Sequence, residues 1–379
     1  VAPWAGAQGR PAFRDSRVLV CGGDCTGSDA LLGKYPSELL RNARVTDTEH
    51  QRPGPLLQLE ALRCAFGSVT AVDDVSIEVS AGEIVCLLGP SGCGKSTILR
   101  LIAGLEKVTS GTIYIGSKDV THMDPAARGV TMVFQSYALF PHLNVRENIL
   151  FGLKVRGISS AERDKRLGEA ALMMGLTDLL NRKPAQLSGG QRQRVSLARS
   201  IVSRRRVCLM DEPLSNLDAK LRAEMRDEIR MLQQKLKLTM IFVTHDQVEA
   251  MTMADQVVLL RQGYVEQTGP PHTLYESPCT TFAAQFIGSP PMNLLEVASI
   301  KERGALATAC GGSLSADCLA EGFIGVRPED VQVGPNGLPV RIASVDYLGA
   351  ETVLRLTHDG QILFARIDAL VKSHAADLL

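Results

Sequence analysis

The chain has 379 residues, 45% of them hydrophobic, which is enough for two domains with separate cores. Lys and Arg together number 41, as do Asp and Glu, so the zero net charge does not point to nucleic acid as a partner. No apolar run approaches the roughly 20 residues of a membrane-spanning helix. Nine cysteines without paired CxxC spacing favour a reduced, cytoplasmic setting.

Residues 1–55 form the first distinct segment. They are rich in Gly, Pro, Arg and Ser and show no hydrophobic period. They also lack the basic start, apolar stretch and cleavage site of a secretory signal. We expect this segment to be disordered or a non-native N-terminal extension.

Regular patterns begin with short β-rich segments at 57–62 and 75–79, followed by a continuous apolar run at 84–88. Such a run is typical of a strand buried on both faces, as in parallel sheets. After a glycine-rich turn, residues 97–103 predict a helix that Gly104 ends. The predicted order is therefore strand, glycine-rich loop, helix.

From about 135 to 187 the pattern is helical, and Ser159 with Glu162 matches a capping box. Further strands are predicted at 207–210 and 240–243. Between these strands lies an amphipathic helix whose apolar face we interpret as core rather than a partner groove; it consists of Leu221, Met225, Ile229, Leu232 and Leu236.

The last part of the chain reads as a smaller β domain. The segment 288–291, Gly-Ser-Pro-Pro, ends the α/β block, and short strands separated by turns are predicted at 340–347, 352–357 and 362–367. These strands predict a small β-barrel-like second domain.

The glycine-rich turn fits the phosphate-loop pattern G-x-x-x-x-G-K-[ST] in its required place between strand and helix. Glycines let backbone N–H groups approach phosphates, and the helix start adds partial positive charge. Lys95 would meet the β and γ phosphates, and the Ser96 hydroxyl would reach Mg²⁺. For Cys93 we favour a passive position over a redox switch. The predicted ATP site comprises Gly89, Pro90, Ser91, Gly92, Cys93, Gly94, Lys95, Ser96 and Thr97.

Two adjacent carboxylates end the apolar segment 207–210. The strand would bring Asp211 beside the phosphate loop, where it could contact ATP and order the water shell of Mg²⁺. Glu212 could polarise an attacking water. The sequence therefore predicts a nucleotide-hydrolysing site.

Three further motifs are Gln135 between Phe134 and Ser136, Leu-Ser-Gly-Gly-Gln at 187–191, and Thr-His-Asp at 244–246. With them, residues 57–290 resemble the ATP-binding cassette of ABC transporters. The resemblance implies an α/β fold with a RecA-like parallel sheet. It also implies a cassette at 56–290 whose helical subdomain spans about 136–190.

The resemblance implies roles for single residues. Gln135 would couple Mg²⁺ and water to the transport partner, and His245 would contact the γ-phosphate as a switch. Phe66 resembles the aromatic residue that stacks on adenine, with core packing as the alternative. Ser188 is also a good N-cap. The resemblance also implies a dimer, which we expect to consist of identical chains. Across it, five residues would contact the ATP held by the other copy: Ser188, Gly189, Gly190, Gln191 and Asp218.

Segments 134–142, 212–222 and 287–293 resemble bacterial importers of the maltose and glycerol-3-phosphate type. Residues 325–330 resemble the first motif of their C-terminal OB/TOBE-like regulatory domain, here 291–379, which we expect to be shortened. This implies ATP-driven carbohydrate or sn-glycerol-3-phosphate import with two integral membrane permease subunits, a solute-binding protein acting indirectly, and a peripheral place on the cytoplasmic membrane face. A polyamine or iron(III) importer, and a soluble nucleic-acid-associated ATPase, are the alternatives. We expect no nucleic-acid partner.

Overall fold

The computed structural model describes residues 18–20, 55–296, 323–333, 338–358 and 360–368. The chain divides into two compact units, one of residues 51–272 and the other of residues 1–50 together with 273–379. The predicted cassette boundary at 290 lies within the second unit and stays a prediction. Apart from Val18–Val20, the expectation of disorder before residue 55 falls outside the described residues.

A six-stranded sheet forms the centre of unit 51–272, in the order β11-β10-β4-β9-β8-β7. All neighbouring pairs are parallel except β10 with β11. Every residue of β4 and β9 is buried, which explains their continuous apolar sequences. The strands are β4 (Ile84–Leu88), β7 (Val130–Val133), β8 (Val207–Asp211), β9 (Thr239–Val243), β10 (Gln256–Arg261) and β11 (Tyr264–Gly269).

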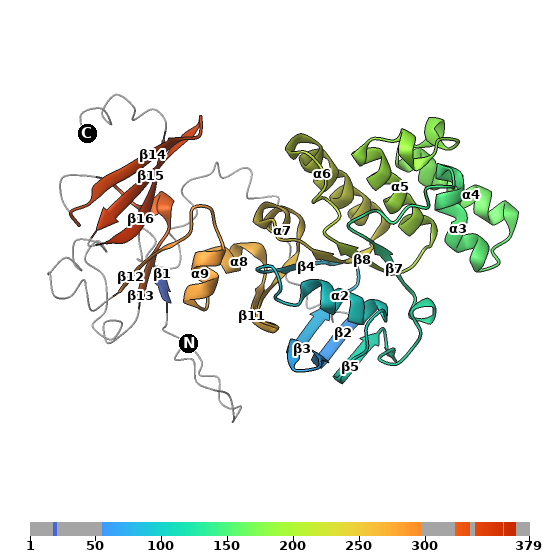
Figure 1. The fold of residues 1–379 in the computed structure, drawn as a ribbon, viewed down its shortest axis with the longest axis horizontal. Helices are drawn as coiled ribbons and strands as arrows, with labels where there is room; N and C mark the ends of the chain where they lie inside the picture. The colour runs from blue at the N-terminus through green and yellow to red at the C-terminus, as the bar shows by residue number, and fades with distance from the viewer. Residues whose placement is uncertain (1–17, 21–54, 297–322, 334–337, 359, 369–379) are drawn as a thin grey trace, which may run out of the picture. The chain divides into compact units, whose positions relative to one another are not determined.

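A second, antiparallel sheet has the order β3-β2-β5-β6. Helix α2 (Lys95–Ala103) lies between this sheet and the central strands and shares one hydrophobic core with both (Figure 1). The predicted helix is thus confirmed, with its start two residues earlier. The strands are β2 (Leu57–Phe66), β3 (Val69–Val79), β5 (Ser110–Ile115) and β6 (Lys118–Asp119).

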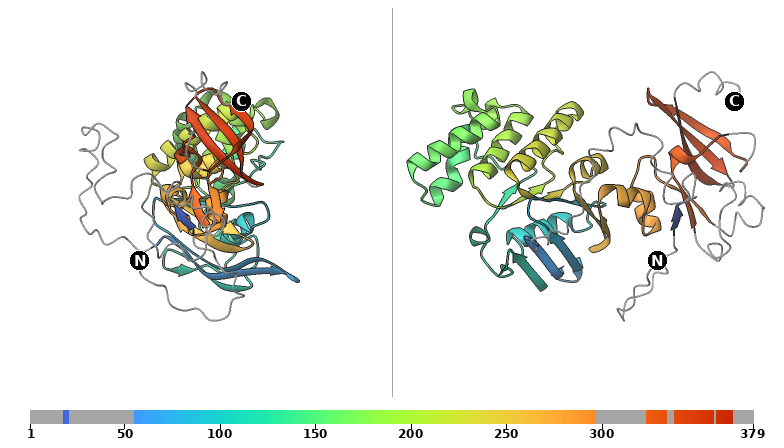
Figure 2. Two further views of the ribbon diagram at one scale, coloured as in Figure 1. Left: turned by 90° about the vertical axis from the view of Figure 1, so that its left-hand side faces the viewer. Right: turned by 180° about the vertical axis from the view of Figure 1, so that it is seen from behind.

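The remaining helices of this unit lie on the other side of the central strands, as the view from behind in Figure 2 also shows. They are α3 (Val145–Val155), α4 (Ser160–Met173), α5 (Gly189–Val202), α6 (Ala219–Leu236) and α7 (Gln247–Met253). Met225, Ile229 and Leu232 are buried, so the amphipathic face of α6 is core, as predicted. Residues 135–144 form turns, so the prediction of helix from 135 was wrong there.

The predicted capping box at the start of α4 was half wrong. Ser159 Oγ accepts the backbone N–H of Glu162 at 3.4 Å, as expected. The Glu162 carboxylate, however, binds Arg166 at 2.7 Å and Arg204 at 3.3 Å instead of the Ser159 backbone. Hydrogen bonds to a guanidinium are charge-assisted and stronger than a bond to a neutral N–H, so the carboxylate turns to the arginines.

Arg128 closes the C-terminal end of α2. Its side chain is almost fully buried, and burial lowers the pKa of its guanidinium. Gly104 ends the helix at φ 77°, and a Cβ there would lie 2.5 Å from Arg128 Nε, so the helix must end on glycine. The guanidinium donates to four carbonyl oxygens, those of Leu101, Ile102, Thr121 and Met123.

The second unit contains two small sheets and two short helices, α8 (Pro271–Glu276), which begins just before the division, and α9 (Thr281–Phe286). In one sheet, β13 pairs parallel with β1 and antiparallel with β12. The other sheet is fully antiparallel and confirms the three strands predicted after residue 340. The strands are β1 (Val18–Val20), β12 (Asn293–Glu296), β13 (Phe323–Val326), β14 (Arg341–Tyr347), β15 (Glu351–His358) and β16 (Gln361–Asp368).

Arg327 binds the helical segment of this unit to the end of β13. It is 3% exposed, and its guanidinium lies 3.9 Å from the centre of the Tyr275 ring. It donates to the Ile287 carbonyl at 2.6 Å and also to the Tyr275 and Ala284 carbonyls. This buried arginine thereby satisfies carbonyls that would otherwise lack partners.

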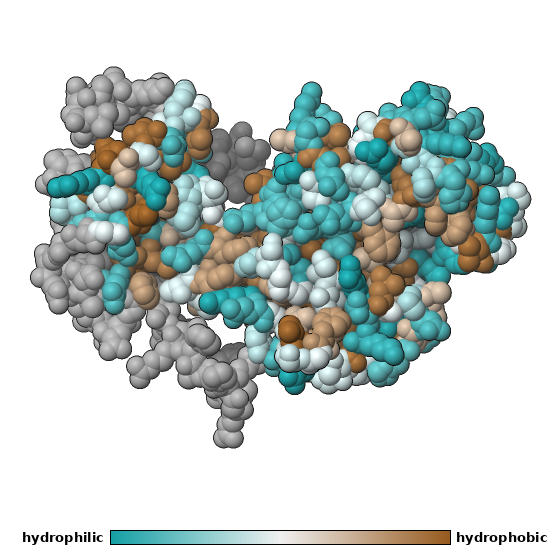
Figure 3. Space-filling model, viewed as in Figure 1, coloured by the Kyte–Doolittle hydropathy of each residue, from teal (hydrophilic) through white to brown (hydrophobic). Residues whose placement is uncertain are grey.

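No helix in the described part of the chain is long and apolar enough to cross a membrane. Figure 3 shows hydrophilic residues over most of the visible face of α5 and α6. The surface of these helices is therefore that of a water-exposed domain face.

Candidate nucleotide-binding site

The loop between β4 and α2 can be built only with glycine at two positions. Gly89 has φ 153°, and a Cβ there would lie 2.3 Å from the Leu260 carbonyl oxygen. Gly94 has φ 101°, and its Cβ would lie 2.5 Å from the Ala71 carbonyl oxygen. Glycine at both positions therefore permits the tight turn that phosphate loops use.

Lys95 is the first residue of α2 and lies within the loop. Its side chain is 6% exposed, and Nζ donates to the carbonyl oxygens of Gly89 and Pro90, each at 2.8 Å. Cys93 Sγ is 3.7 Å from the same nitrogen. The carbonyl groups of the loop therefore hold the Lys95 amino group in place.

The start of α2 lacks the side-chain cap that most other helices have. Its N-cap residue is Gly94, which offers no side chain. The first backbone N–H groups of a helix have no partner within the helix, and their dipoles favour an anion. This end of α2 therefore fits a phosphate group. The helices α3, α4, α5, α6, α7 and α9 are capped by Asn144, Ser159, Ser188, Asp218, Asp246 and Thr280.

The predicted magnesium ligands Ser96 and Asp211 lie together. Ser96 Oγ donates to Asp211 Oδ1 at 2.8 Å, which joins the start of α2 to the end of β8. Within the described residues, no group of three or more His, Cys, Asp and Glu could hold a metal ion unaided. A hydroxyl and one carboxylate fit a Mg²⁺ ion that takes its remaining ligands from phosphate and water.

Glu212 and His245 also come together, from the ends of the neighbouring strands β8 and β9. Glu212 Oε2 lies 3.2 Å from His245 Nδ1. The Glu212 backbone has φ 45° and donates its N–H to the Val243 carbonyl at 3.0 Å. A non-glycine residue in the left-handed region is strained, and such strain gathers at functional sites. The carboxylate is thus held next to the imidazole by a conformation that costs free energy.

Glu249 contacts Thr244, the residue before His245, and was not predicted from the sequence. It is 2% exposed, and Thr244 Oγ1 donates to its Oε2 at 2.6 Å. Burial raises the pKa of Glu249, while the Thr244 hydrogen bond opposes that rise. A glutamate in the short helix after the Thr-His-Asp motif carries no sequence signal of burial, because α7 has too few residues to show a period.

Gln135 contacts the segment that follows Glu212. Its Nε2 donates to Ser215 Oγ at 3.4 Å, and its carbonyl accepts from Asn216 Nδ2 at 3.0 Å. Among the described residues, no recorded interaction joins Gln135 to Ser96 or Asp211. Its place at Mg²⁺ therefore stays a prediction.

Phe66 lies at the end of β2, before the turn at Gly67. Its side chain is 51% exposed, so the alternative that it packs in the core was wrong. An exposed aromatic face is available for stacking. Stacking on adenine stays a prediction.

The residues predicted to act across a dimer begin two helices. Ser188 and Gln191 form a full capping box at the start of α5, with bonds of 3.3 and 3.0 Å. Asp218 Oδ1 caps α6 through the Leu221 N–H at 2.9 Å. A Cβ at Gly190 would lie 3.0 Å from the Leu221 side chain, which explains a glycine there. In the described part of the chain, no hydrogen bond or ion pair joins these residues to 89–97.

The chain matches known proteins over both units. Residues 72–215 match the family described as ABC transporter, and residues 324–376 match the TOBE domain. It is 49% identical over 322 residues to the sn-glycerol-3-phosphate import ATP-binding protein UgpC of Brucella abortus biovar 1, covering 82% of this chain and 89% of that protein. The chain belongs to the ABC transporter family. It is an ATP-hydrolysing subunit of that family, as predicted.

Two further relatives have the same name as the Brucella protein. UgpC of Ruegeria pomeroyi is 50% identical over 301 residues, covering 79% of this chain and 85% of that one. UgpC of Salmonella typhi is 45% identical over 321 residues, covering 82% of this chain and 90% of that one.

Solved structures also resemble the chain. The bacterial cassette MJ0796, described as dimeric, is 31% identical with a TM-score of 0.52, and the match covers 57% of this chain and 98% of MJ0796. A second MJ0796 structure, in a post-hydrolysis state with ADP and Pi, has a TM-score of 0.51 at the same identity and coverage. The predicted cassette fold with an OB-like C-terminal domain is confirmed.

Proposed function

We propose that this ABC ATPase drives the import of sn-glycerol-3-phosphate. The geometry carries the ATPase part through one arrangement: the phosphate loop, the Ser96–Asp211 pair and the Glu212–His245 pair all lie at the carboxyl ends of neighbouring parallel strands. The relatives support the solute, because proteins of that import system are 45% to 50% identical to this chain over most of its length.

Each residue then has a distinct task. Lys95 and the N–H groups at the start of α2 bind the phosphates of ATP. Ser96 and Asp211 would hold Mg²⁺, which would supply positive charge to the phosphate oxygens. The Glu212 carboxylate accepts a proton from the attacking water, and His245, 3.2 Å away, fixes the orientation of that carboxylate.

A complete site needs a second copy of the chain. The proposed in-trans residues of α5 and α6 have no recorded contact with the phosphate loop of their own chain, and the related MJ0796 cassette is described as dimeric. In a head-to-tail dimer, Ser188 and Asp218 of one copy face the ATP on the other. The start of α5 adds a helix dipole that favours the γ-phosphate.

The proposed transporter contains two membrane permease subunits, with this ATPase on the cytoplasmic face of the membrane. Gln135 is placed to report nucleotide state to them, since its bonds to Ser215 and Asn216 connect it with the segment that follows Glu212. A solute-binding protein delivers the solute on the far side.

Uptake in a bacterial strain that lacks its own glycerol-3-phosphate import ATPase tests the solute. We expect the full chain to restore uptake of labelled sn-glycerol-3-phosphate. The Glu212→Gln chain, expressed at the same level, is the control for ATP hydrolysis. Restored maltose uptake in a strain lacking the maltose ATPase, without glycerol-3-phosphate uptake, would overturn the proposed solute.

A further inference from the structure

The turn that carries His245 is fixed by the residues on either side of it. Thr244 and Asp246 flank His245, and these three residues join β9 to α7. The His245 side chain is 59% exposed, so little packing holds it in place beside Glu212. The direction of the imidazole therefore depends on the conformation of the turn.

The hydroxyl of Thr244 lies at the centre of a hydrogen-bond network in this turn. Thr244 is 2% exposed, and its Oγ1 donates to Glu249 Oε2 at 2.6 Å and accepts the Asp246 backbone N–H at 2.9 Å. The Thr244 backbone N–H donates to the carbonyl of Leu87 at 3.3 Å. Leu87 lies in β4, the strand that leads into the phosphate loop, so Thr244 connects that strand with the turn.

The two acidic residues of this network have further partners. Asp246 Oδ1 caps α7 by accepting the N–H groups of Val248 and Glu249 at 2.8 and 3.4 Å. Arg222 of α6 lies beside both carboxylates, 3.4 Å from Asp246 Oδ2 and 3.9 Å from Glu249 Oε1. Its positive charge offsets part of the cost of burying Glu249. The bonds of Thr244 are thereby anchored in two helices, α6 and α7.

A second buried threonine makes the same kind of bonds elsewhere in the cassette. Thr121, which follows β6, is 5% exposed. Its Oγ1 donates to Asp119 Oδ1 at 2.6 Å and accepts the Ile113 N–H at 2.9 Å. Thr121 and Thr244 therefore match in burial and in both bond lengths, and they differ in that Thr244 adjoins His245.

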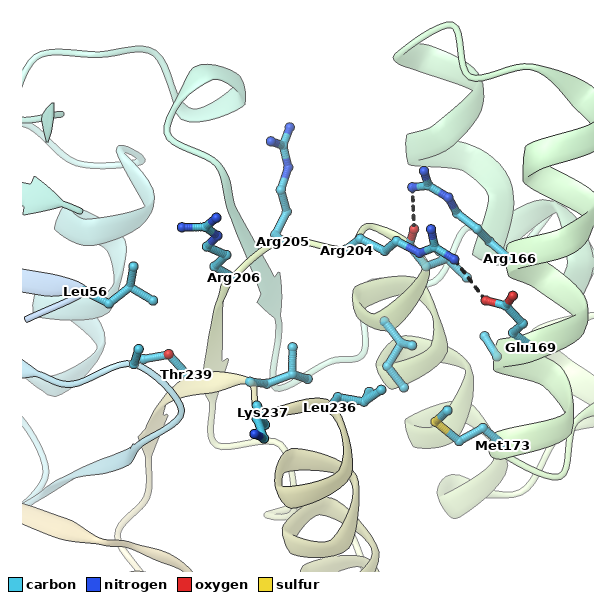
Figure 4. Close-up of a pocket in the computed structure, with 15 residues that line it drawn as sticks. Leu56, Arg166, Glu169, Met173, Arg204, Arg205, Arg206, Leu236, Lys237 and Thr239 are labelled. Atoms are coloured by element: carbon cyan, nitrogen blue, oxygen red, sulfur yellow. Dashed lines mark hydrogen bonds and ion pairs between the residues drawn. The ribbon is translucent and has the colours of Figure 1, made fainter. Parts of the chain in front are cut away.

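Another buried threonine, Thr239, lies at the start of β9, the strand that Thr244 follows. It lines a cavity of about 570 Å³ whose walls also include residues of α4 and of the loop 203–206 (Figure 4). Its Oγ1 accepts the Gly82 N–H at 2.8 Å. Because β4 and β9 are parallel, the start of β9 and the phosphate loop lie at opposite edges of the sheet. Thr239 is therefore a buried threonine of the same strand but remote from the nucleotide site.

We propose that Thr244 is a positioning residue for ATP hydrolysis. Its hydroxyl, held by Glu249 and by the Asp246 N–H, fixes the conformation of the turn, because a buried network in which each bond is made admits one arrangement. That conformation directs the imidazole of His245 toward Glu212. Thr244 acts through His245 and not on ATP itself. The inference rests on the proposed role of the Glu212–His245 pair.

Replacing Thr244 with valine removes the hydroxyl and keeps the shape of the side chain. We expect kcat for ATP hydrolysis by the full chain, measured as phosphate release, to fall roughly tenfold or more, because small misplacements of reacting groups slow catalysis strongly. ATP affinity, measured by calorimetry without Mg²⁺ so that ATP is not consumed, should stay unchanged. Thr244→Ser keeps the hydroxyl and should restore most of kcat. A serine variant as slow as the valine variant would overturn the proposal.

Thr121→Val and Thr239→Val are the matched controls. Each removes a buried hydroxyl, and Thr121→Val removes one that donates to a carboxylate over the same distance as in Thr244. We expect both to lower the melting temperature, as Thr244→Val does, and to leave kcat unchanged. If either control lowers kcat as much as Thr244→Val, the effect belongs to any lost buried hydroxyl and the proposal is wrong.

A double-mutant cycle with His245→Ala tests the route of the effect. We expect Thr244→Val to slow hydrolysis no further once His245 is replaced, because the two residues act through one contact. An equal loss in both backgrounds would contradict the proposal. If His245→Ala hydrolyses ATP at the natural rate, the proposed role of the Glu212–His245 pair fails, and that of Thr244 with it. If His245→Ala is slow and Thr244→Val is not, only the role of Thr244 fails.

Discussion

Glu212 combines a strained backbone with a side-chain partner, and this separates it from the other carboxylates at strand ends. Its φ of 45° directs the side chain toward His245 rather than along the strand. The adjacent Asp211 keeps regular strand geometry and binds Ser96 instead. Two neighbouring acids thereby contact two different partners within one site, and the change of backbone conformation between them separates their roles.

Replacing Glu212 with glutamine tests its role as base. We expect ATP hydrolysis, measured as phosphate release, to fall by about 100-fold or more because the amide cannot accept the proton. ATP affinity by calorimetry should stay unchanged, because Lys95 and the start of α2 remain. Glu224→Gln, on the exposed face of α6, is the control. Near-normal turnover of Glu212→Gln would remove the residue from this role.

The buried carboxyl of Glu249 predicts a pH dependence of stability. Its pKa is raised above the ordinary 4.5, so the folded chain holds the proton to higher pH than the unfolded chain. Unfolding then releases a proton as pH rises above 4.5, and stability falls until the raised pKa is passed. We expect the melting temperature of Glu249→Gln, relative to the natural chain, to rise across this window and then level off. Glu224→Gln should show no such rise.

At the scale of elements, the first residues of a helix show whether its N-terminus is capped by its own side chains or is left to bind a ligand. Most described helices begin with a side-chain cap, whereas α2 begins with a glycine and leaves its N–H groups to a ligand. Helix α5 has the opposite arrangement, a complete capping box at Ser188. Its proposed phosphate contact must therefore be made without breaking that box.

Two serine caps form a matched pair that tests whether Ser188 contacts a phosphate as well as capping its helix. Ser188→Ala and Ser159→Ala each remove a hydroxyl that accepts an N–H at 3.3 to 3.4 Å. We expect both to lower the free energy of unfolding by about 1 kcal/mol. Only Ser188→Ala should also reduce ATP hydrolysis, because α5, unlike α4, faces a nucleotide in the proposed dimer. Equal activity of the two variants would limit Ser188 to capping.

The elements that the sequence predicts best are buried strands, although the buried strand β10 was not predicted. The apolar runs of β4, β8 and β9 are visible without any contact information. The pattern did not predict β7, whose first three residues are only half buried. The helical reading of 135–144 failed because Tyr137 and Ala138 both adopt positive φ, which no helix allows.

The candidate site also contains residues that the sequence predicts and contacts that it does not. The phosphate loop, Asp211, Glu212 and His245 follow from local motifs, and the structure brings their side chains into two hydrogen-bonded or ion-paired couples. The contact of Gln135 with Ser215 joins residues 80 positions apart, and Arg128 reaches back 27 positions to Leu101. Such contacts depend on how the sheet brings distant segments together, and no local spacing records them.

At the scale of the whole molecule, each proposed catalytic site is shared between two chains. The loop side contains Lys95, and the closing side contains Ser188 of the other copy. A chain with a defective loop side still has an intact closing side, and a chain with a defective closing side still has an intact loop side. A dimer of these two chains has one site that contains both defects and one site that contains neither.

Mixing two inactive chains tests this arrangement. We expect Lys95→Ala and Ser188→Arg chains to be nearly inactive separately. Combined after dissociation and reassembly, they should hydrolyse ATP faster than the sum of the two separate rates. A double variant carrying both changes, mixed with itself, is the control. A rate equal to the sum would show that both sides of the site come from one chain.

The guanidinium of Arg128 has a mechanical consequence. Lys95 is the first residue of α2, and Arg128 holds the last carbonyls of the same helix. Arg128 also lies two residues before β7, and Gln135 lies two residues after it. Arg128 thus connects the end of α2 with the segment that leads into β7, and Gln135 follows the other end of that strand. These hydrogen bonds couple the position of α2 to that of the segment before β7 independently of the covalent chain.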